Sequence, residues 1–172
     1  LPQQEALPQD SYLIPYFNQQ AVLGRAGPPV YFVIKEYDYS QRVNQNNLCA
    51  LGKGQGGCKD DSLLNQFTSL ALLPEYFYFT GSLAPWLDNY LSWLSHNGCC
   101  QESKGTQCNV DTPPWIVCQN CMTPNEFDQY GRPAPETFYK YLPFFMMSNC
   151  SDSCALCGSP YQSDVIMPTP YN

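Results

Sequence analysis

The sequence is poor in basic residues and in histidine. Only 8 of its 172 residues are Lys or Arg, against 15 Asp and Glu, so the formal net charge is -7. A chain with no basic stripe to neutralise phosphates is a poor partner for nucleic acid or for anionic membrane surfaces. The one histidine, His96, lies at the end of a predicted helix. A favourable interaction of its charge with the helix dipole is a better explanation for it there than a role as general base. With no further histidine to activate a Ser or Cys nucleophile, we expect a protein that is not an enzyme and needs no cofactor.

Long apolar runs are missing as well. No run approaches the roughly 20 residues that cross a bilayer. The first residues also lack the charged and apolar regions of a signal peptide. The aromatic content of 15% is nevertheless enough for a real hydrophobic core in a single domain.

Cysteine, in contrast, is abundant. Eight of the 10 cysteines lie between Cys99 and Cys157, and this even, crowded set indicates disulfides formed outside the cytosol. Ten cysteines permit roughly 945 pairings, so spacing alone does not pair them. Zinc is the competing interpretation, because Cys118-x-x-Cys121 and Cys154-x-x-Cys157 have a spacing that zinc accepts. A chain with such cysteines and no signal peptide or membrane span of its own is expected to be a piece of a larger exported or membrane protein.

Apolar periodicity predicts helices and strands in alternation. Helices are predicted after Asp10, after Asp60 to Ser62, from Pro85 to Gly98, and from about Pro135 to Met147, where Pro143 should bend or shorten the helix. Strands are predicted at Val30 to Ile34, Tyr76 to Thr80 and Asp164 to Met167, the first being central because it is apolar on both faces. Residues 40–57 are expected to be a loop held by Cys49 and Cys58.

This order of elements indicates a mixed α+β fold with helices on one face of a sheet. A ferredoxin-like fold has two strand-helix-strand halves, and only about one and a half are visible. We therefore expect residues 1–172 to form one incomplete ferredoxin-like domain, a strand-helix-strand sandwich that lacks its C-terminal part. Residues 1–9 are expected to be a linker, and residues 99–132 a disulfide-rich insertion.

Several segments match a known family in the same order. They are Asp10-Ser11-Tyr12-Leu13, Gly27-Pro28-Pro29-Val30-Tyr31-Phe32-Val33, Ala84-Pro85-Trp86-Leu87-Asp88-Asn89-Tyr90 before Cys99-Cys100, and Tyr141-Leu142-Pro143-Phe144-Phe145. In these segments the chain closely resembles the C-terminal cysteine-rich lumenal domain of the Niemann-Pick type C sterol transporters, which belong to the RND and Patched superfamily and whose domain has the RND porter-type fold. The resemblance covers roughly residues 6–165. The family domain continues further, so the chain is expected to be truncated.

The resemblance also implies a disulfide pairing. It implies bonds from Cys49 to Cys58, Cys99 to Cys157, Cys100 to Cys121 and Cys108 to Cys118, which leaves Cys150 with Cys154 as an extra local bridge.

The aromatic residues around the tryptophan helix and one glycosylation sequon are further candidate sites. Trp86, Tyr90 and Trp93, with Tyr76 to Phe79, can line a sterol passage or form a core. Core is favoured for Trp86 and Tyr90, whereas Trp93 falls off the apolar stripe and is the better interface candidate. Asn149-Cys150-Ser151 is a glycosylation sequon with a cysteine at its centre. Asp88 is expected to be an ordinary solvated charge.

The resemblance implies a function in sterol transport. The chain would be a lumenal domain of a multi-spanning, membrane-embedded sterol transporter in late endosomes or lysosomes, or in the vacuole of fungi or plants. It would pack on a sister lumenal domain of the same polypeptide and help pass cholesterol or another sterol from a soluble donor protein to the membrane, touching sterol only indirectly or transiently. The alternative is a Patched-like or secreted cysteine-rich domain that binds a protein and moves no lipid.

Overall fold

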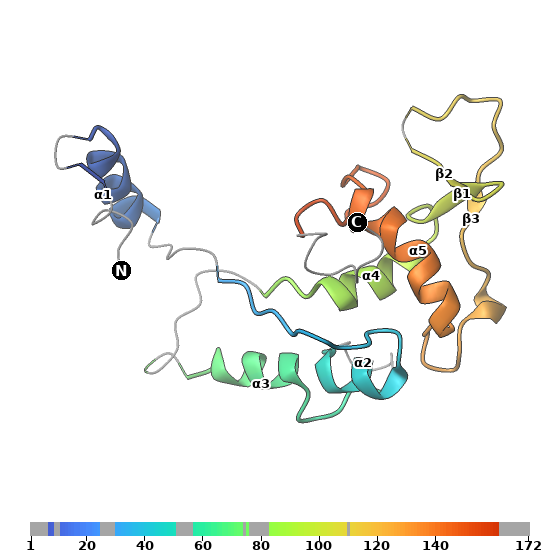
Figure 1. The fold of residues 1–172 in the computed structure, drawn as a ribbon, viewed down its shortest axis with the longest axis horizontal. Coiled ribbons are helices and arrows are strands. Elements are labelled where there is room, and N and C mark those ends of the chain that lie inside the picture. The colour runs from blue at the N-terminus through green and yellow to red at the C-terminus, as the bar shows by residue number, and fades with distance from the viewer. Residues whose placement is uncertain are drawn as a thin grey trace.

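The computed structural model describes residues 7–8, 11–24, 30–50, 57–73, 75, 83–109 and 111–161. Its helices are α1 (Leu13–Gly24), α2 (Arg42–Leu48), α3 (Leu63–Leu70), α4 (Trp86–Ser95), the 3-10 helix η2 (Pro124–Glu126) and α5 (Pro135–Met147). Its strands are β1 (Gln101–Ser103), β2 (Thr106–Gln107) and β3 (Gln119–Asn120). Figure 1 shows α1 apart from a body that contains the other elements. In the described residues no helix is long and apolar enough to cross a bilayer.

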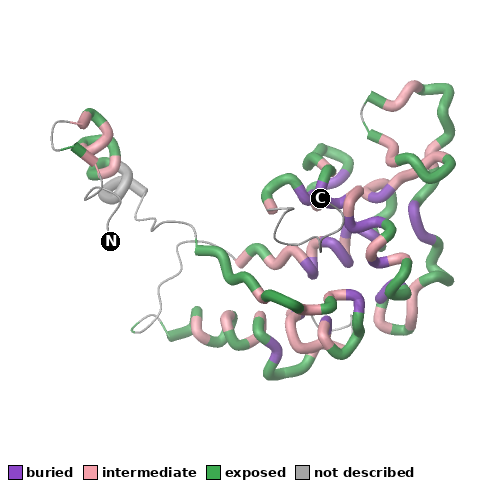
Figure 2. The backbone as a smooth tube through the Cα atoms, in the orientation of Figure 1, coloured by how far each residue is buried: buried purple, intermediate pink, exposed green. Residues whose placement is uncertain are grey.

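The core lies where α4 and α5 meet, which Figure 2 shows as the main concentration of buried backbone. Apolar residues recur at helical spacing on both helices and turn one face of each toward the other. The ring of Tyr90 lies 4.9 Å from that of Phe138 and 5.3 Å from that of Phe145. The Tyr90 hydroxyl donates a hydrogen bond of 2.5 Å to the carbonyl of Phe138. Helix α5 keeps its 13 residues through Pro143, so of the two effects expected of Pro143, bending or shortening, the shortening is wrong.

The strands form a small antiparallel sheet in the order β2-β1-β3. Lys104 and Gly105 join β1 to β2 with φ values of 51° and 81°, the positive pair that a two-residue hairpin turn requires. Glu102 lies opposite Gln107 on β2 and Gln119 on β3. The α+β class is therefore present, and the sheet of the described residues lies inside residues 99–132. The ferredoxin-like sandwich stays a prediction, because two of its expected strands, at 76–80 and 164–167, lie outside the described residues.

Residues 30–34 differ from the prediction of a central strand. They form no sheet in the structure, and Val30, Tyr31 and Phe32 expose 70%, 67% and 60% of their surface. Apolar side chains on both faces need a sheet partner to become central, and the part of the chain that the structure describes places none beside them. The predicted strands at 76–80 and 164–167, and most of the expected linker over 1–9, lie outside the described residues.

The expected loop over residues 40–57 contains helix α2, which the sequence prediction missed. Its residues Arg-Val-Asn-Gln-Asn-Asn-Leu give almost no apolar periodicity. The helix is held by its polar side chains, because Gln45 is buried and its amide donates 2.9 Å to the carbonyl of Tyr39. The disulfide from Cys49 to Cys58 then connects the end of α2 to the segment before α3.

Candidate functional site

All ten cysteines are in disulfides, and these bonds decide which segments lie together. Three bonds agree with those that the resemblance implies, namely Cys49–Cys58, Cys100–Cys121 and Cys108–Cys118. The other two are exchanged: Cys99 bonds to Cys154 and Cys150 to Cys157.

The exchange follows from a tight turn after α5. The Ser151 amide donates 2.9 Å to the carbonyl of Cys154, and the Cys154 amide donates 3.1 Å back to the carbonyl of Ser151. This turn buries Cys154 beside the end of α4, with its Cα 5.2 Å from that of Cys99. Cys150 and Cys157 then face each other with a Cα separation of 5.0 Å. Both separations are ordinary for disulfides.

The zinc interpretation does not fit this arrangement. Within the two C-x-x-C pairs, Cys118 is bonded to Cys108, Cys121 to Cys100, and Cys154 to Cys99. Because a cysteine binds zinc only as a free thiolate, these sulfurs are not available as ligands. The described residues also contain no other group of His, Cys, Asp and Glu that is suited to a metal ion.

Trp93 is a core residue, so its prediction as an interface residue is wrong. It is 1% exposed, and its ring lies 5.5 Å from the ring of Phe145 on α5. Helix α5 and the segment after it cover the side of α4 that the sequence left without a partner. Tyr90 is fully buried as well, whereas Trp86 is half-buried and packs its ring 4.9 Å from Tyr39. These aromatic side chains pack in the core or at its edge, while residues 76–79 lie outside the described part.

A buried polar cluster joins α2, α4 and the loop before α5. Arg132 is 2% exposed and donates 3.1 Å to the Gln45 side-chain oxygen and 3.1 Å to the Cys49 sulfur. Asp88 is 8% exposed, which corrects its prediction as a solvated charge, and it accepts a 2.9 Å hydrogen bond from the Ala50 amide. The signal for its burial was its position three residues before the buried Leu91.

Burial dominates the protonation of this cluster. Desolvation raises the pKa of Asp88, against the Ala50 hydrogen bond and the charge of Arg132, which lower it. Desolvation also lowers the pKa of Arg132, and the charge of Asp88 opposes that change. One Asp88 oxygen and the Arg132 Nε have no hydrogen-bond partner. The two charges therefore hold three segments together at a cost in desolvation.

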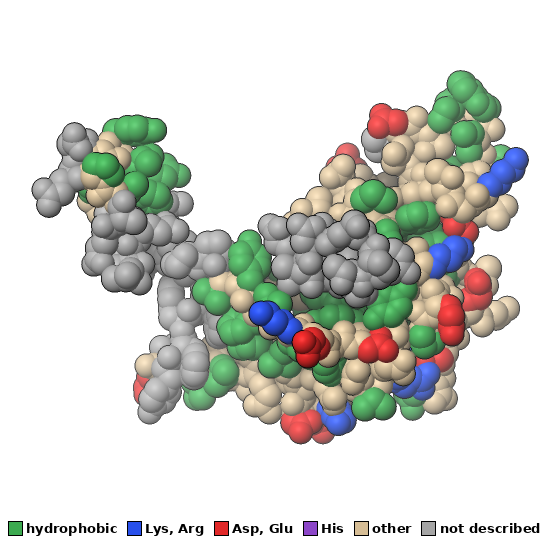
Figure 3. Space-filling model, in the orientation of Figure 1, with side chains coloured by type: hydrophobic (Ala, Val, Ile, Leu, Met, Phe, Trp, Pro, Cys, Tyr) green, Lys and Arg blue, Asp and Glu red, His purple; other side chains and the backbone are tan. Residues whose placement is uncertain are grey.

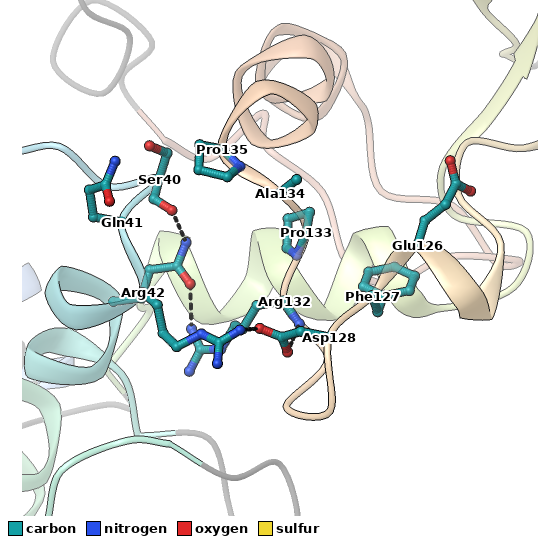
Figure 4. Close-up of a pocket in the computed structure, with 11 residues that line it drawn as sticks. Ser40, Gln41, Arg42, Glu126, Phe127, Asp128, Arg132, Pro133, Ala134 and Pro135 are labelled. Atoms are coloured by element: carbon teal, nitrogen blue, oxygen red, sulfur yellow. Dashed lines mark hydrogen bonds and ion pairs between the residues drawn. The ribbon is translucent and has the colours of Figure 1, made fainter.

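An open groove of about 350 Å³ lies beside this cluster. Figure 4 shows Arg42 and Asp128 pointing toward one another at its rim, where they form an ion pair. Arg132 reaches into the groove from the loop before α5. Arg42 and Arg132 already have partners, so the groove presents paired charges to a ligand. Its lining contains neither a histidine nor a cysteine.

Next to the groove, Asp38 is held ionised by hydroxyl groups. Its carboxylate accepts 2.7 Å from the Ser40 hydroxyl and 2.8 Å from the Tyr139 hydroxyl. The hydrogen bonds, that of the Ser40 side chain foremost, lower the pKa of Asp38 to about 2. Partial burial, and then Asp38 itself, raise the pKa of Tyr139 to about 12. Asp38 thereby ties the segment before α2 to α5.

The described residues thus define a disulfide-bonded α+β domain whose buried polar groups are used mainly to connect its own segments. No family model matches the chain. It is 32% identical over 96% of its length to NPC intracellular cholesterol transporter 1 of Sus scrofa, and 30% identical over 98% to NPC intracellular cholesterol transporter 1 homolog 1b of Drosophila melanogaster. It is 33% identical over 96% to NPC1-like intracellular cholesterol transporter 1 of Rattus norvegicus.

Over nearly its whole length, the chain is therefore related to a segment of the NPC-type intracellular cholesterol transporters, which confirms the resemblance seen in the sequence. The chain spans 13%, 13% and 12% of the lengths of these three relatives. All three are named as transporters.

Proposed function

We propose that this chain is a lumenal domain of a multi-spanning sterol transporter. The observation that carries the proposal is its similarity, over 96% to 98% of its length, to proteins named as cholesterol transporters. Five disulfides support an oxidising compartment, which for such a transporter is the lumen of the late endosome or lysosome, or of the vacuole in fungi and plants.

In this role the domain supports sterol passage by packing on a sister lumenal domain of the same polypeptide. Exposed apolar side chains at residues 30–33 give it a surface for such packing, and Phe32 already lies 4.4 Å from the ring of Phe67 on α3. The packed pair passes cholesterol from a soluble donor protein toward the membrane. The burial of Tyr90 and Trp93 favours indirect contact with sterol over a passage through α4.

A chimeric transporter tests the proposal. This chain would replace the matching segment of the Sus scrofa transporter in cells that lack the transporter, and lumenal cholesterol would be measured by filipin staining. We expect the chimera to clear cholesterol. A control chimera with a Gly/Ser linker of equal length should reach the same compartment and leave the cholesterol there.

Two outcomes contradict the proposal. One is a correctly localised, disulfide-bonded chimera that clears no more cholesterol than the linker control, which would favour the protein-interaction alternative. The other is clearance by the linker control itself, because the segment would then have no part in transport.

We also propose that Asn149 carries an N-linked glycan. Its side chain is exposed directly after α5, in the sequon Asn149-Cys150-Ser151. Cys150 is exposed too and bonded to Cys157, so the sequon lies on a closed turn at the surface. A mass decrease on treatment with peptide N-glycosidase, absent in Asn149→Gln, would support the site, and an unchanged mass would contradict it.

A further inference from the structure

The loop between β2 and β3 presents an apolar tip. Trp115, Ile116 and Val117, which we call the Trp115 tip, expose 80%, 39% and 76% of their surface. Figure 1 shows this loop projecting beyond the three-stranded sheet, and Figure 3 shows hydrophobic side chains gathered at that end of the molecule. Trp115 is thus far more exposed than the buried Trp93 or the half-buried Trp86.

The loop holds this tip in place. The disulfide from Cys108 to Cys118 closes its base. At its end the Ile116 amide donates 2.9 Å to the carbonyl of Pro113, which makes a β-turn with Pro114 in the second position and Trp115 in the third. A segment that is already ordered loses little conformational freedom when it binds, so more of its apolar contact appears as affinity.

The size of the tip limits what can cover it. Trp115 exposes roughly 200 Å² at the usual size of an aromatic side chain, and its two neighbours add less. The sum remains well below the about 800 Å² that each partner contributes to a standard protein interface. A convex tip of this size is too small for a stable dimer or protein complex, whereas a lipid surface accepts it without a matching pocket.

The chemistry of the tip indicates which lipid surface. Tryptophan is enriched at the boundary between headgroups and hydrocarbon. Among the described residues of the loop, 109 and 111–117, the one charged side chain is Asp111, and the whole chain carries a net charge of -7. An anionic surface would repel both the Asp111 carboxylate and the negatively charged chain as a whole. We propose that the Trp115 tip inserts into the interfacial region of an electrically neutral phospholipid bilayer.

This inference rests on the loop itself and not on the transporter function. The tip lies at the far end of the body from residues 30–33, so both surfaces can be occupied at once. A bound bilayer would fix the orientation of the domain relative to the membrane.

Vesicles of phosphatidylcholine test the proposal with the full chain. Tryptophan emission would be recorded during titration with vesicles, with and without brominated phosphatidylcholine as a quencher. We expect a blue shift and quenching by the brominated lipid. Trp115→Ser should bind at least about tenfold more weakly, since it removes the largest part of the apolar area that would be buried. For this variant, binding is measured by co-sedimentation with the vesicles.

Leu72→Ser is the matched control, because Leu72 is 77% exposed and lies after α3, away from the loop. It should bind as the unmodified chain does. Val117→Ser should weaken binding in the same direction as Trp115→Ser, which separates insertion from an effect on one tryptophan signal. Near-ultraviolet circular dichroism, dominated by the buried aromatic core, should remain the same in Leu72→Ser and Val117→Ser, and far-ultraviolet circular dichroism should remain the same in all three variants.

Three results would overturn the proposal. The first is no binding to phosphatidylcholine vesicles. The second is equal binding by the unmodified chain and Trp115→Ser. The third is a dimer in analytical ultracentrifugation that Trp115→Ser dissociates, because a second copy of the chain would then cover the tip.

Discussion

Removing the Cys99–Cys154 disulfide should destabilise the domain more than removing the Cys150–Cys157 disulfide. Both bonds fix the segment that follows α5, but they close chain segments of very different length, with sequence separations of 55 and 7. In the chain-entropy model the stabilisation grows with the logarithm of the closed loop. It amounts to about 4 kcal/mol for the longer loop and about 2.5 kcal/mol for the shorter one.

The two bonds can be compared with matched double variants. Cys99→Ala with Cys154→Ala removes the long closure, and Cys150→Ala with Cys157→Ala removes the short one. Each pair includes one cysteine that is almost fully buried, Cys154 at 7% and Cys157 at 4% exposure, so the lost packing is similar. Urea unfolding at neutral pH should give free energies of unfolding that differ by roughly 2 kcal/mol.

Equal losses in the two double variants, or a larger loss for the short closure, would refute this reasoning. Peptide mapping without reduction provides an independent check on the unmodified chain. A peptide that joins Cys99 to Cys157 would show that the pairing itself is different.

Three further predictions concern the core and its polar cluster. Trp93→Ala should lower the free energy of unfolding by about 3–5 kcal/mol, whereas Trp115→Ala should change it by less than about 0.5 kcal/mol. Urea unfolding of both variants measures this difference, and equal effects would mean that Trp93 is an exposed interface residue. Gly158→Ala should cost about 1–3 kcal/mol, because the new Cβ would lie 2.0 Å from the carbonyl oxygen of Phe145, and an unchanged melting temperature would contradict this close approach. Burial raises the pKa of Asp88 above its ordinary value of 3.8, so the folded state binds the Asp88 proton more tightly than the unfolded state does. The protonated carboxyl therefore contributes to the free energy of unfolding at low pH, and that contribution is lost as the pH rises from 3.8 through the folded pKa. Asp88→Asn should remove that fall in thermal unfolding measured across the same pH range, and an unchanged pH profile would exclude Asp88 as its source.

Local signals in the sequence were enough for four helices, the first of them α1, which follows the predicted start at Asp10. Ser62 caps α3 by accepting a hydrogen bond from the Asn65 amide, as one of the three residues proposed for that cap. Helix α4 begins directly after Pro85, and α5 spans the predicted residues 135–147. In each case the cap or the apolar spacing lies within one or two turns, so no distant contact is needed to recognise it.

The remaining features depend on contacts that are distant in the sequence. Trp93 is buried because α5, more than 40 residues later, packs over it, and no periodicity within α4 can show that. Helix α2 forms around Gln45, whose partner Arg132 lies 87 residues away. The last two disulfides depend on the turn from Ser151 to Cys154, which decides whether Cys154 or Cys157 reaches Cys99.

The adjacent cysteines at the end of α4 have one more consequence, for how the domain survives cleavage. Cys99 and Cys100 send bonds to Cys154 and Cys121, so the backbone from residue 101 to residue 153 lies entirely inside a covalent ring. A protease that cuts once anywhere in that stretch, including the Trp115 loop, leaves both ends attached to the same two residues. The domain can thus be nicked in the Trp115 loop and still keep its pieces joined, with α4 attached to the segment after α5, until a reductant opens the ring.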